Sequence, residues 1–260
     1  MAKRFEGKVV LVTGCGSVGP GWGNGKAISV LFAREGAKVY GCDINPKAAA
    51  ETQEIIRKQG GLCEVRVTDI GKSEQVKELI DACVQHFGRI DVLINNVAIG
   101  GQGGPVDYPE EKWRRDLDVN ITAMFLTCRH AIPHMEKQGG GSIVNIGSIS
   151  GIRGSGVGII SYETTKAAIL GFSRGVALQY GAKQIRSNVV MPGMIAAPAF
   201  MQDMGDPVAA EAMGKRIPIG HLGDAWDVAE AVLYLASDAA KFVTATELIV
   251  DGGSSARLSN

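Results

Sequence analysis

Short apolar runs and amphipathic stretches alternate along the chain, and this alternation predicts its secondary structure. Continuous apolar runs of strand length are typical of strands buried on both faces of a sheet. Runs that are wholly or mainly apolar lie at residues 9–12, 38–42, 65–67, 92–94, 143–146, 189–190 and 248–250. They predict a sheet that is covered on both sides.

Helical periodicity fills the segments between these runs. From residue 73 to 87 the apolar positions recur at i, i+3, i+4, i+7, i+8 and i+11, which indicates an amphipathic helix. Further helices are predicted at residues 25–35, 113–135, 162–180 and 226–236. Strand–helix alternation with right-handed crossovers gives an α/β fold with a doubly wound, Rossmann-type parallel sheet. With no linker or repeat visible, we expect one domain over residues 1–260, with its ligand at the carboxyl ends of the strands.

Composition and charge narrow the range of partners. The 27 Lys and Arg balance 27 Asp and Glu, which argues against binding to nucleic acid or a membrane surface through clustered charge. The charged N-terminus does not resemble a secretion signal, and no apolar run has the length of a membrane span. The five cysteines are scattered and odd in number, so we expect free thiols and a cytoplasmic protein.

A glycine-rich segment joins the first predicted strand to the first predicted helix. Thr13-Gly14 ends the strand, and Gly23-Asn24-Gly25 opens the helix. Glycines there let the backbone approach a pyrophosphate, and the helix N-terminus offers free N–H groups. Asp43 ends the second strand, 18 residues after Gly25, where a carboxylate would accept hydrogen bonds from an adenosine ribose.

These and later motifs together resemble the short-chain dehydrogenase/reductase family over essentially the whole chain. Thr13-Gly14 and Gly23-Asn24-Gly25 resemble its glycine turn, and Asn95-Asn96-Val97-Ala98 resembles its NNAG segment. Asn120, Ser148 and the Tyr162…Lys166 pair resemble its catalytic Asn, Ser and YxxxK. Pro192-Gly193 and Val250-Asp251-Gly252-Gly253 resemble its late elements. The resemblance implies a homotetramer or homodimer and a set of cofactor-binding residues: Gly14, Ser17, Gly23, Asn24, Asp43, Asp69, Ile70, Asn96, Ala98, Tyr162, Lys166, Pro192, Gly193 and Ile195.

The YxxxK spacing suggests how a tyrosine could act as the general acid–base. A free tyrosine has a pKa near 10, and Lys166, one helical turn after Tyr162, would lower it. The resemblance implies that Ser148 binds the substrate oxygen, that Lys166 also contacts the nicotinamide ribose, and that Asn120 holds a water in a proton relay. The expected reaction is hydride transfer between a nicotinamide cofactor and a small secondary alcohol or ketone.

The sequence also departs from the family pattern, and these departures bear on the cofactor. The glycine turn carries about five extra residues, 18–22, and Trp22 among them could lie near the phosphates or fix the loop. Ala197 replaces a threonine that often follows the PG element, so Ile195 is taken as the substitute contact. Asp43 would repel the 2′-phosphate of NADP, and we therefore predict NAD.

Several alternatives remain open on sequence alone. An enoyl reductase would resemble a Tyr-x6-Lys pattern, but Ile169 stands at that position. A non-catalytic dinucleotide-sensing or scaffold protein could share the same fold. His130 and His134 are spaced to share a metal but no third ligand is evident, so we predict no metal site. Residues 195–217 resemble a substrate lid, and its methionines suit an apolar substrate or simple helix packing equally well.

Overall fold

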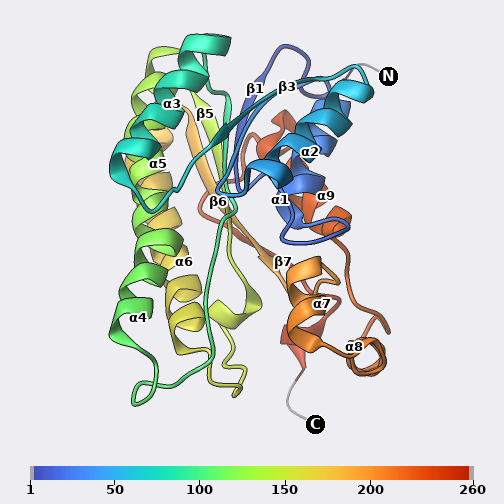
Figure 1. Cartoon of the computed structure of the whole chain (residues 1–260). Helices are drawn as coiled ribbons and strands as arrows, with labels where there is room; N and C mark the ends of the chain where they lie inside the picture. The colour runs from blue at the N-terminus through green and yellow to red at the C-terminus, as the bar shows by residue number, and fades with distance from the viewer. Residues whose placement is uncertain (1–2, 258–260) are drawn as a thin grey trace.

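The computed structural model describes residues 3–257, in which strands and helices alternate (Figure 1). The strands are β1 (Val9–Thr13), β2 (Lys38–Asp43), β3 (Leu62–Val67), β4 (Val92–Asn95), β5 (Gly141–Ile146), β6 (Ile185–Pro192) and β7 (Glu247–Val250). The helices are α1 (Asn24–Arg34), α2 (Pro46–Lys58), α3 (Ser73–Phe87), α4 (Glu110–Leu117), α5 (Ala123–Lys137), α6 (Ile160–Tyr180), α7 (Pro198–Met204), α8 (Pro207–Lys215) and α9 (Ala225–Ala236).

All neighbouring strands run parallel in one seven-stranded sheet of order β3-β2-β1-β4-β5-β6-β7. Helices α1, α2 and α9 cover one face, and α3, α5 and α6 cover the other (Figure 1). The doubly wound single domain predicted from the sequence is therefore confirmed. The strand order reverses between β1 and β4, which places the ligand-binding crevice of such a fold at their carboxyl ends.

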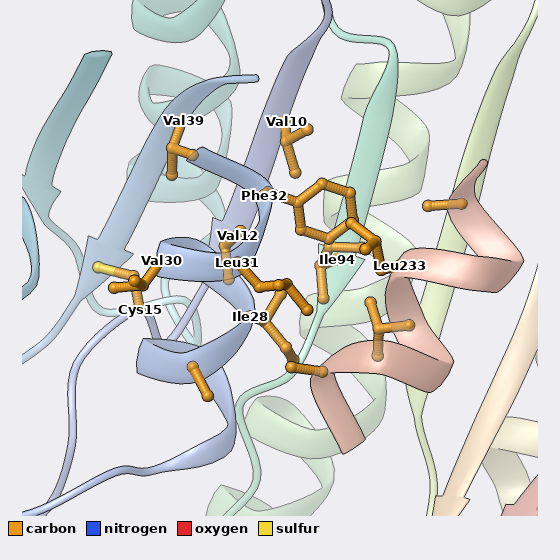
Figure 2. Packing of buried hydrophobic residues seen from close by; sticks show 14 of the residues in the cluster. Val10, Val12, Cys15, Ile28, Val30, Leu31, Phe32, Val39, Ile94 and Leu233 are labelled. Atoms are coloured by element: carbon orange, nitrogen blue, oxygen red, sulfur yellow. The ribbon is translucent and has the colours of Figure 1, made fainter. Parts of the chain in front are cut away.

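Helix α1 is buried between the sheet and α9, and this contact fixes where the glycine-rich segment emerges. Ile28 and Phe32 are fully buried against strand residues such as Val10 and Ile94, and Leu233 of α9 packs beside them (Figure 2). Fully burying a side chain of this size stabilises the fold by about 1.5–3 kcal/mol. The N-terminus of α1 is thus held rigidly below the end of β1.

The structure differs from the predicted helices in two places, and it shows helices within the segment expected as a lid. The predicted helix 113–135 is interrupted by a π-helical segment, Asp118–Thr122, between α4 and α5. Helix α2 is absent from the sequence prediction because most of its residues are polar. The segment expected as a lid, 195–217, contains the two short helices α7 and α8.

Within residues 3–257, no helix is long and apolar enough to cross a membrane. All five cysteines are buried and unpaired. The same range holds no group of three or more His, Cys, Asp or Glu side chains that could bind a metal ion.

Candidate active site

Two glycines of the β1–α1 segment occupy positions that no other residue can take without rearrangement. Gly14 has a positive φ of 66°. A Cβ on Gly25 would lie 1.7 Å from the carbonyl oxygen of Gly14. The backbone at the start of α1 therefore crosses the backbone at the end of β1 at a distance that only a residue without a side chain allows.

A small hydrogen-bond network from β4 fixes this crossing. Thr13 Oγ1 donates to Ile94 O and accepts from Asn96 N at 3.0 Å. The Asn96 carboxamide donates to the carbonyl oxygens of Thr13 and Gly14. The side chain of Asn96, predicted to bind cofactor, thus holds the glycine turn in place.

The N-terminus of α1 has unused hydrogen-bonding capacity. Its N-cap is Gly23, which has no side chain to accept a hydrogen bond, and its first turn contains no acidic residue. Within the described part of the chain, Asn24 Oδ1 is one of two buried side-chain atoms that lack a partner. Free N–H groups and the positive end of the helix dipole suit a pyrophosphate, so these residues fit a dinucleotide cofactor.

The inserted residues 18–22 are held through contacts of Trp22 and Gly21. The ring of Trp22 lies 4.7 Å from that of Trp226 in α9. The buried Lys26 ammonium donates to Gly21 O at 3.1 Å, pairs with Glu51 at 2.6 Å and lies over the Trp22 ring. Of the two roles open to Trp22, the structure has the one in which it fixes the loop.

The carboxylate of Asp43 lies beside the glycine turn. One carboxylate oxygen accepts a hydrogen bond from Gly16 N at 2.9 Å, and the other accepts from Asn45 N at 2.9 Å. The next helix, α2, is capped by the Asn45 side chain, which accepts from Lys47 N and Ala48 N. The N-terminus of α2 is therefore already satisfied, and a carboxylate stands in front of it.

Asp69 and Ile70 follow β3 at the same edge of the sheet. Burial opposes the charge on Asp69, but hydrogen bonds from Arg115 and Gly71 N outweigh it and lower the pKa of the carboxyl. Ile70 is buried. The preceding Thr68 has the other buried side-chain oxygen without a partner among residues 3–257, as expected where a ligand supplies the missing hydrogen bond.

Tyr162 and Lys166 lie one turn apart on α6, next to Ser148 at the end of β5. The ammonium nitrogen of Lys166 lies 5.4 Å from the centre of the Tyr162 ring and donates to Ile146 O at 2.7 Å. Ser148 caps the 3₁₀ turn Ile149–Gly151 by accepting from Ser150 N at 3.1 Å. The three residues that the sequence placed in one site are therefore neighbours.

Burial has the largest effect on the pKa values of Tyr162 and Lys166. Burial raises the pKa of Tyr162, and a hydrogen bond with Ser148 only partly offsets this. Burial also lowers the pKa of Lys166 to about 7. Burial thus opposes the charged form of both side chains, and the lowering of the Tyr162 pKa by Lys166 stays a prediction.

Asn120 lies in the π-helical segment and is completely buried. Its carboxamide accepts from Ile99 N at 2.8 Å and donates to Ile99 O and to Thr165 Oγ1. The side chain therefore ties α6 to the loop after β4. π-Helical turns occur frequently at functional sites because they shift a residue out of helical register.

The remaining predicted contacts lie at or after the carboxyl ends of β4 and β6. Ala98 follows β4, and Pro192 ends β6. A Cβ on Gly193 would lie 2.6 Å from the Cβ of Asp251. Ile195 is buried and bridges to Gly223. Arg153, in the loop after the 3₁₀ turn, donates to Ser255 O and Ile152 O.

Sequence reasoning missed a buried carboxylate next to Tyr162. Asp116 on α4 is 4% exposed, and its Oδ2 accepts from Tyr108 Oη at 2.6 Å and from Ser161 Oγ at 2.5 Å. Asp116 stands in a run of charged residues on α4, a pattern typical of a solvated helix. Lys112 stands four residues before Asp116, at the spacing of an ordinary surface ion pair, so the sequence carries no signal of a different role.

Comparisons with known proteins agree with this geometry. A crystal structure from Burkholderia xenovorans assigned as a short-chain dehydrogenase/reductase superposes with a TM-score of 0.94, is 44% identical, and is matched over 99% of this chain and 100% of that one. A sequence profile described as enoyl-(acyl carrier protein) reductase matches residues 20–255. The chain belongs to the short-chain dehydrogenase/reductase family.

Two further members show the chemistry of this family. Cyclohexanol dehydrogenase from Acinetobacter sp. (strain SE19) is 35% identical over 97% of this chain and 96% of its own length. The structure of a 7α-hydroxysteroid dehydrogenase with NADH and 7-oxo glycochenodeoxycholic acid is 34% identical and superposes with a TM-score of 0.90. The match covers 97% of this chain and 96% of that one. As a short-chain dehydrogenase/reductase, the protein is an oxidoreductase that transfers a hydride with a nicotinamide cofactor.

Proposed function

We propose that the protein is an NAD-dependent dehydrogenase or reductase of apolar secondary alcohols and ketones, with Tyr162 as its general acid–base. The observation that carries the proposal is the arrangement of Ser148, Tyr162 and Lys166 beside an uncapped α1 N-terminus and Asp43. The cofactor, when bound, accepts or supplies the hydride. The side chains supply binding, orientation and the proton.

Each residue of the site has a part in this proposal. Ser148 Oγ accepts from Ser150 N, and its own proton is directed to the side where Tyr162 lies and can bind the substrate oxygen there. Tyr162 takes the hydroxyl proton during oxidation and returns it during reduction. Because both ends of the Asn120 carboxamide are engaged, a relay water at this residue would have to use its main-chain carbonyl.

The choice of NAD rests on Asp43 and on the capped start of α2. A 2′-phosphate would meet a carboxylate and would find the first N–H groups of α2 already bonded to Asn45. Like charges in contact cost about 3 kcal/mol, which corresponds to roughly a hundredfold preference for NAD.

An enoyl reductase is the second candidate, because of the description of the matching profile. The position seven residues after Tyr162 is Ile169, which is completely buried in a cluster with Met124, Leu170, Val189 and Met191. The lysine that an enoyl reductase would have at this position is therefore missing from this chain. Exposed apolar side chains near the site, among them Ile99 and Ile152, favour an apolar ketone or alcohol.

The first experiment measures thermal stabilisation by NAD and by NADP side by side, in the parent protein and in Asp43→Ser. NAD should stabilise the parent far more than NADP, and the variant should lose most of this preference. Equal stabilisation of the parent by both would refute the role of Asp43. Stabilisation by neither would favour a protein that does not use the cofactor.

Turnover is tested next with cyclohexanol and NAD, and with cyclohexanone and NADH, by the absorbance of the reduced nicotinamide. Tyr162→Phe should bind NAD and lose nearly all turnover. Tyr180→Phe, the same substitution at the far end of α6, is the matched control and should keep its turnover. Substantial turnover in Tyr162→Phe would overturn the assignment of the general acid–base.

A further inference from the structure

Asp116 connects three segments that carry the site, although it belongs to none of the predicted catalytic positions. It lies on α4, four residues before Asn120. Its Oδ2 accepts both from Ser161, which precedes Tyr162, and from Tyr108, which closes the loop after β4. We propose that Asp116 is a positioning residue that holds Tyr162 and the 99–108 loop in register for catalysis, an inference that rests on the function proposed above.

The start of α6 needs such an anchor. Tyr162 is only the third residue of this helix, and the N-cap residue Ile159 has an apolar side chain that offers no acceptor for the first N–H groups. First turns fray when their N–H groups are unsatisfied. The bond from Ser161 to a buried carboxylate fixes this turn, and a negative charge near a helix N-terminus is favourable in its own right.

The second hydroxyl on the same oxygen anchors the loop that faces Tyr162. A Cβ on Gly101 would lie 3.0 Å from Tyr108 Oη, and one on Gly103 would lie 2.8 Å from Tyr108 Cδ2, so the loop packs directly on this ring. A Cβ on Gly100 would lie 3.1 Å from that of Tyr162. The position of the loop and the position of the tyrosine are therefore set by one carboxylate.

The two bonds predict different kinetic defects. Ser161→Ala loosens the turn that carries Tyr162, and kcat should fall about tenfold, short of the roughly hundredfold that a 1 Å misplacement can cost. Tyr108→Phe loosens the loop, and the substrate KM should rise while kcat stays within about twofold. NAD affinity should stay unchanged in both, because neither residue contacts the glycine turn.

The matched control is Ser173→Ala. Ser173 is on the same helix, is equally buried, and has one buried hydrogen bond, to Ser187 at 2.9 Å. It lies twelve residues along α6 from Ser161, so its loss should affect stability but leave kcat and KM within about twofold. Asp116→Asn, whose amide oxygen can accept both bonds, should retain most of the turnover that Asp116→Ala loses.

Hydrogen exchange supplies a readout that needs no activity. Amides of residues 160–164 should exchange roughly three- to tenfold faster in Ser161→Ala than in the parent, as expected for one lost buried hydrogen bond. In Ser173→Ala the exchange rates of the same amides should equal those of the parent. Unchanged exchange there, or unchanged kcat in Ser161→Ala together with unchanged KM in Tyr108→Phe, would overturn the role of Asp116. A parent without turnover, or an active Tyr162→Phe, would instead refute the proposed function, and exchange would still decide on Asp116.

Discussion

Replacing the buried Lys166 with methionine should stabilise the protein near neutral pH while abolishing turnover. Lys166 is 2% exposed, and burial lowers its pKa from 10.5 to about 7. The folded state therefore binds the proton more weakly than the unfolded state does. This difference is a free-energy cost of folding that an uncharged side chain of similar length removes.

The size of the effect follows from these two pKa values. A fall from 10.5 to about 7 corresponds to a cost of about 4–5 kcal/mol at pH 7 and below. Methionine leaves Ile146 O without its donor, which costs about 1–3 kcal/mol. We expect Lys166→Met to be more stable than the parent by about 2 kcal/mol at pH 7.

The difference should depend on pH in a defined direction. Between pH 7 and 10.5 the folded lysine is neutral while the unfolded one is still charged, so the parent gains stability as the pH rises. The variant has no such gain. Its advantage should therefore shrink above pH 7, and near pH 10 the parent should be the more stable protein because it keeps the hydrogen bond.

The assay is urea unfolding of the cofactor-free protein at several pH values, followed by tryptophan fluorescence. Lys183→Met is the control, because the Lys183 side chain is 62% exposed and its removal should change stability little at any pH. A Lys166→Met variant that is less stable than the parent at pH 7, or a stability difference that is the same at pH 7 and pH 10, would refute this account of Lys166.

Two further predictions concern the glycine turn and its inserted residues. Gly25→Ala should lose NAD binding in isothermal titration, because its Cβ would collide with Gly14 O at 1.7 Å; binding at the parent's affinity would contradict the crossing described for this turn. Trp226→Ala should lower the unfolding free energy by about 2 kcal/mol and weaken NAD binding, since Trp22 loses its stacking partner. Weakened stability with unchanged NAD affinity would show that the insertion is independent of the cofactor site.

The fold could be predicted from the sequence where burial alone determines it. The central strands β1 and β4 are apolar over most of their length because helices cover both faces of the sheet, so they can be recognised without knowing which segments pack against them. Helix α2 was missed because it buries only Ala48, Ala49, Thr52 and Ile56. Its start was nevertheless visible as Asn45-Pro46, an N-cap residue followed by a proline at the first helical position.

The site was predictable in its membership but not in its electrostatics. The positions of Ser148, Tyr162 and Lys166 follow from motifs, yet the pKa of Lys166 depends on burial that no spacing reveals. The π-helical segment at Asn120 preserves an ordinary apolar pattern. The role of Asp116 could not be predicted because its donors, Tyr108 and Ser161, lie 8 and 45 residues away and meet only in the folded chain.

The inserted part of the glycine turn has a consequence for how the cofactor arrives. The Lys26 ammonium donates to Gly21 O, the Trp226 ring packs against the Trp22 ring, and a Cβ on Gly19 would touch Gln202 of α7. The conformational entropy of this long loop is therefore lost when the protein folds, and little of it remains to be lost on association. The cofactor encounters a preorganised surface, so its rate of entry should follow diffusion and orientation rather than the closing of a loop.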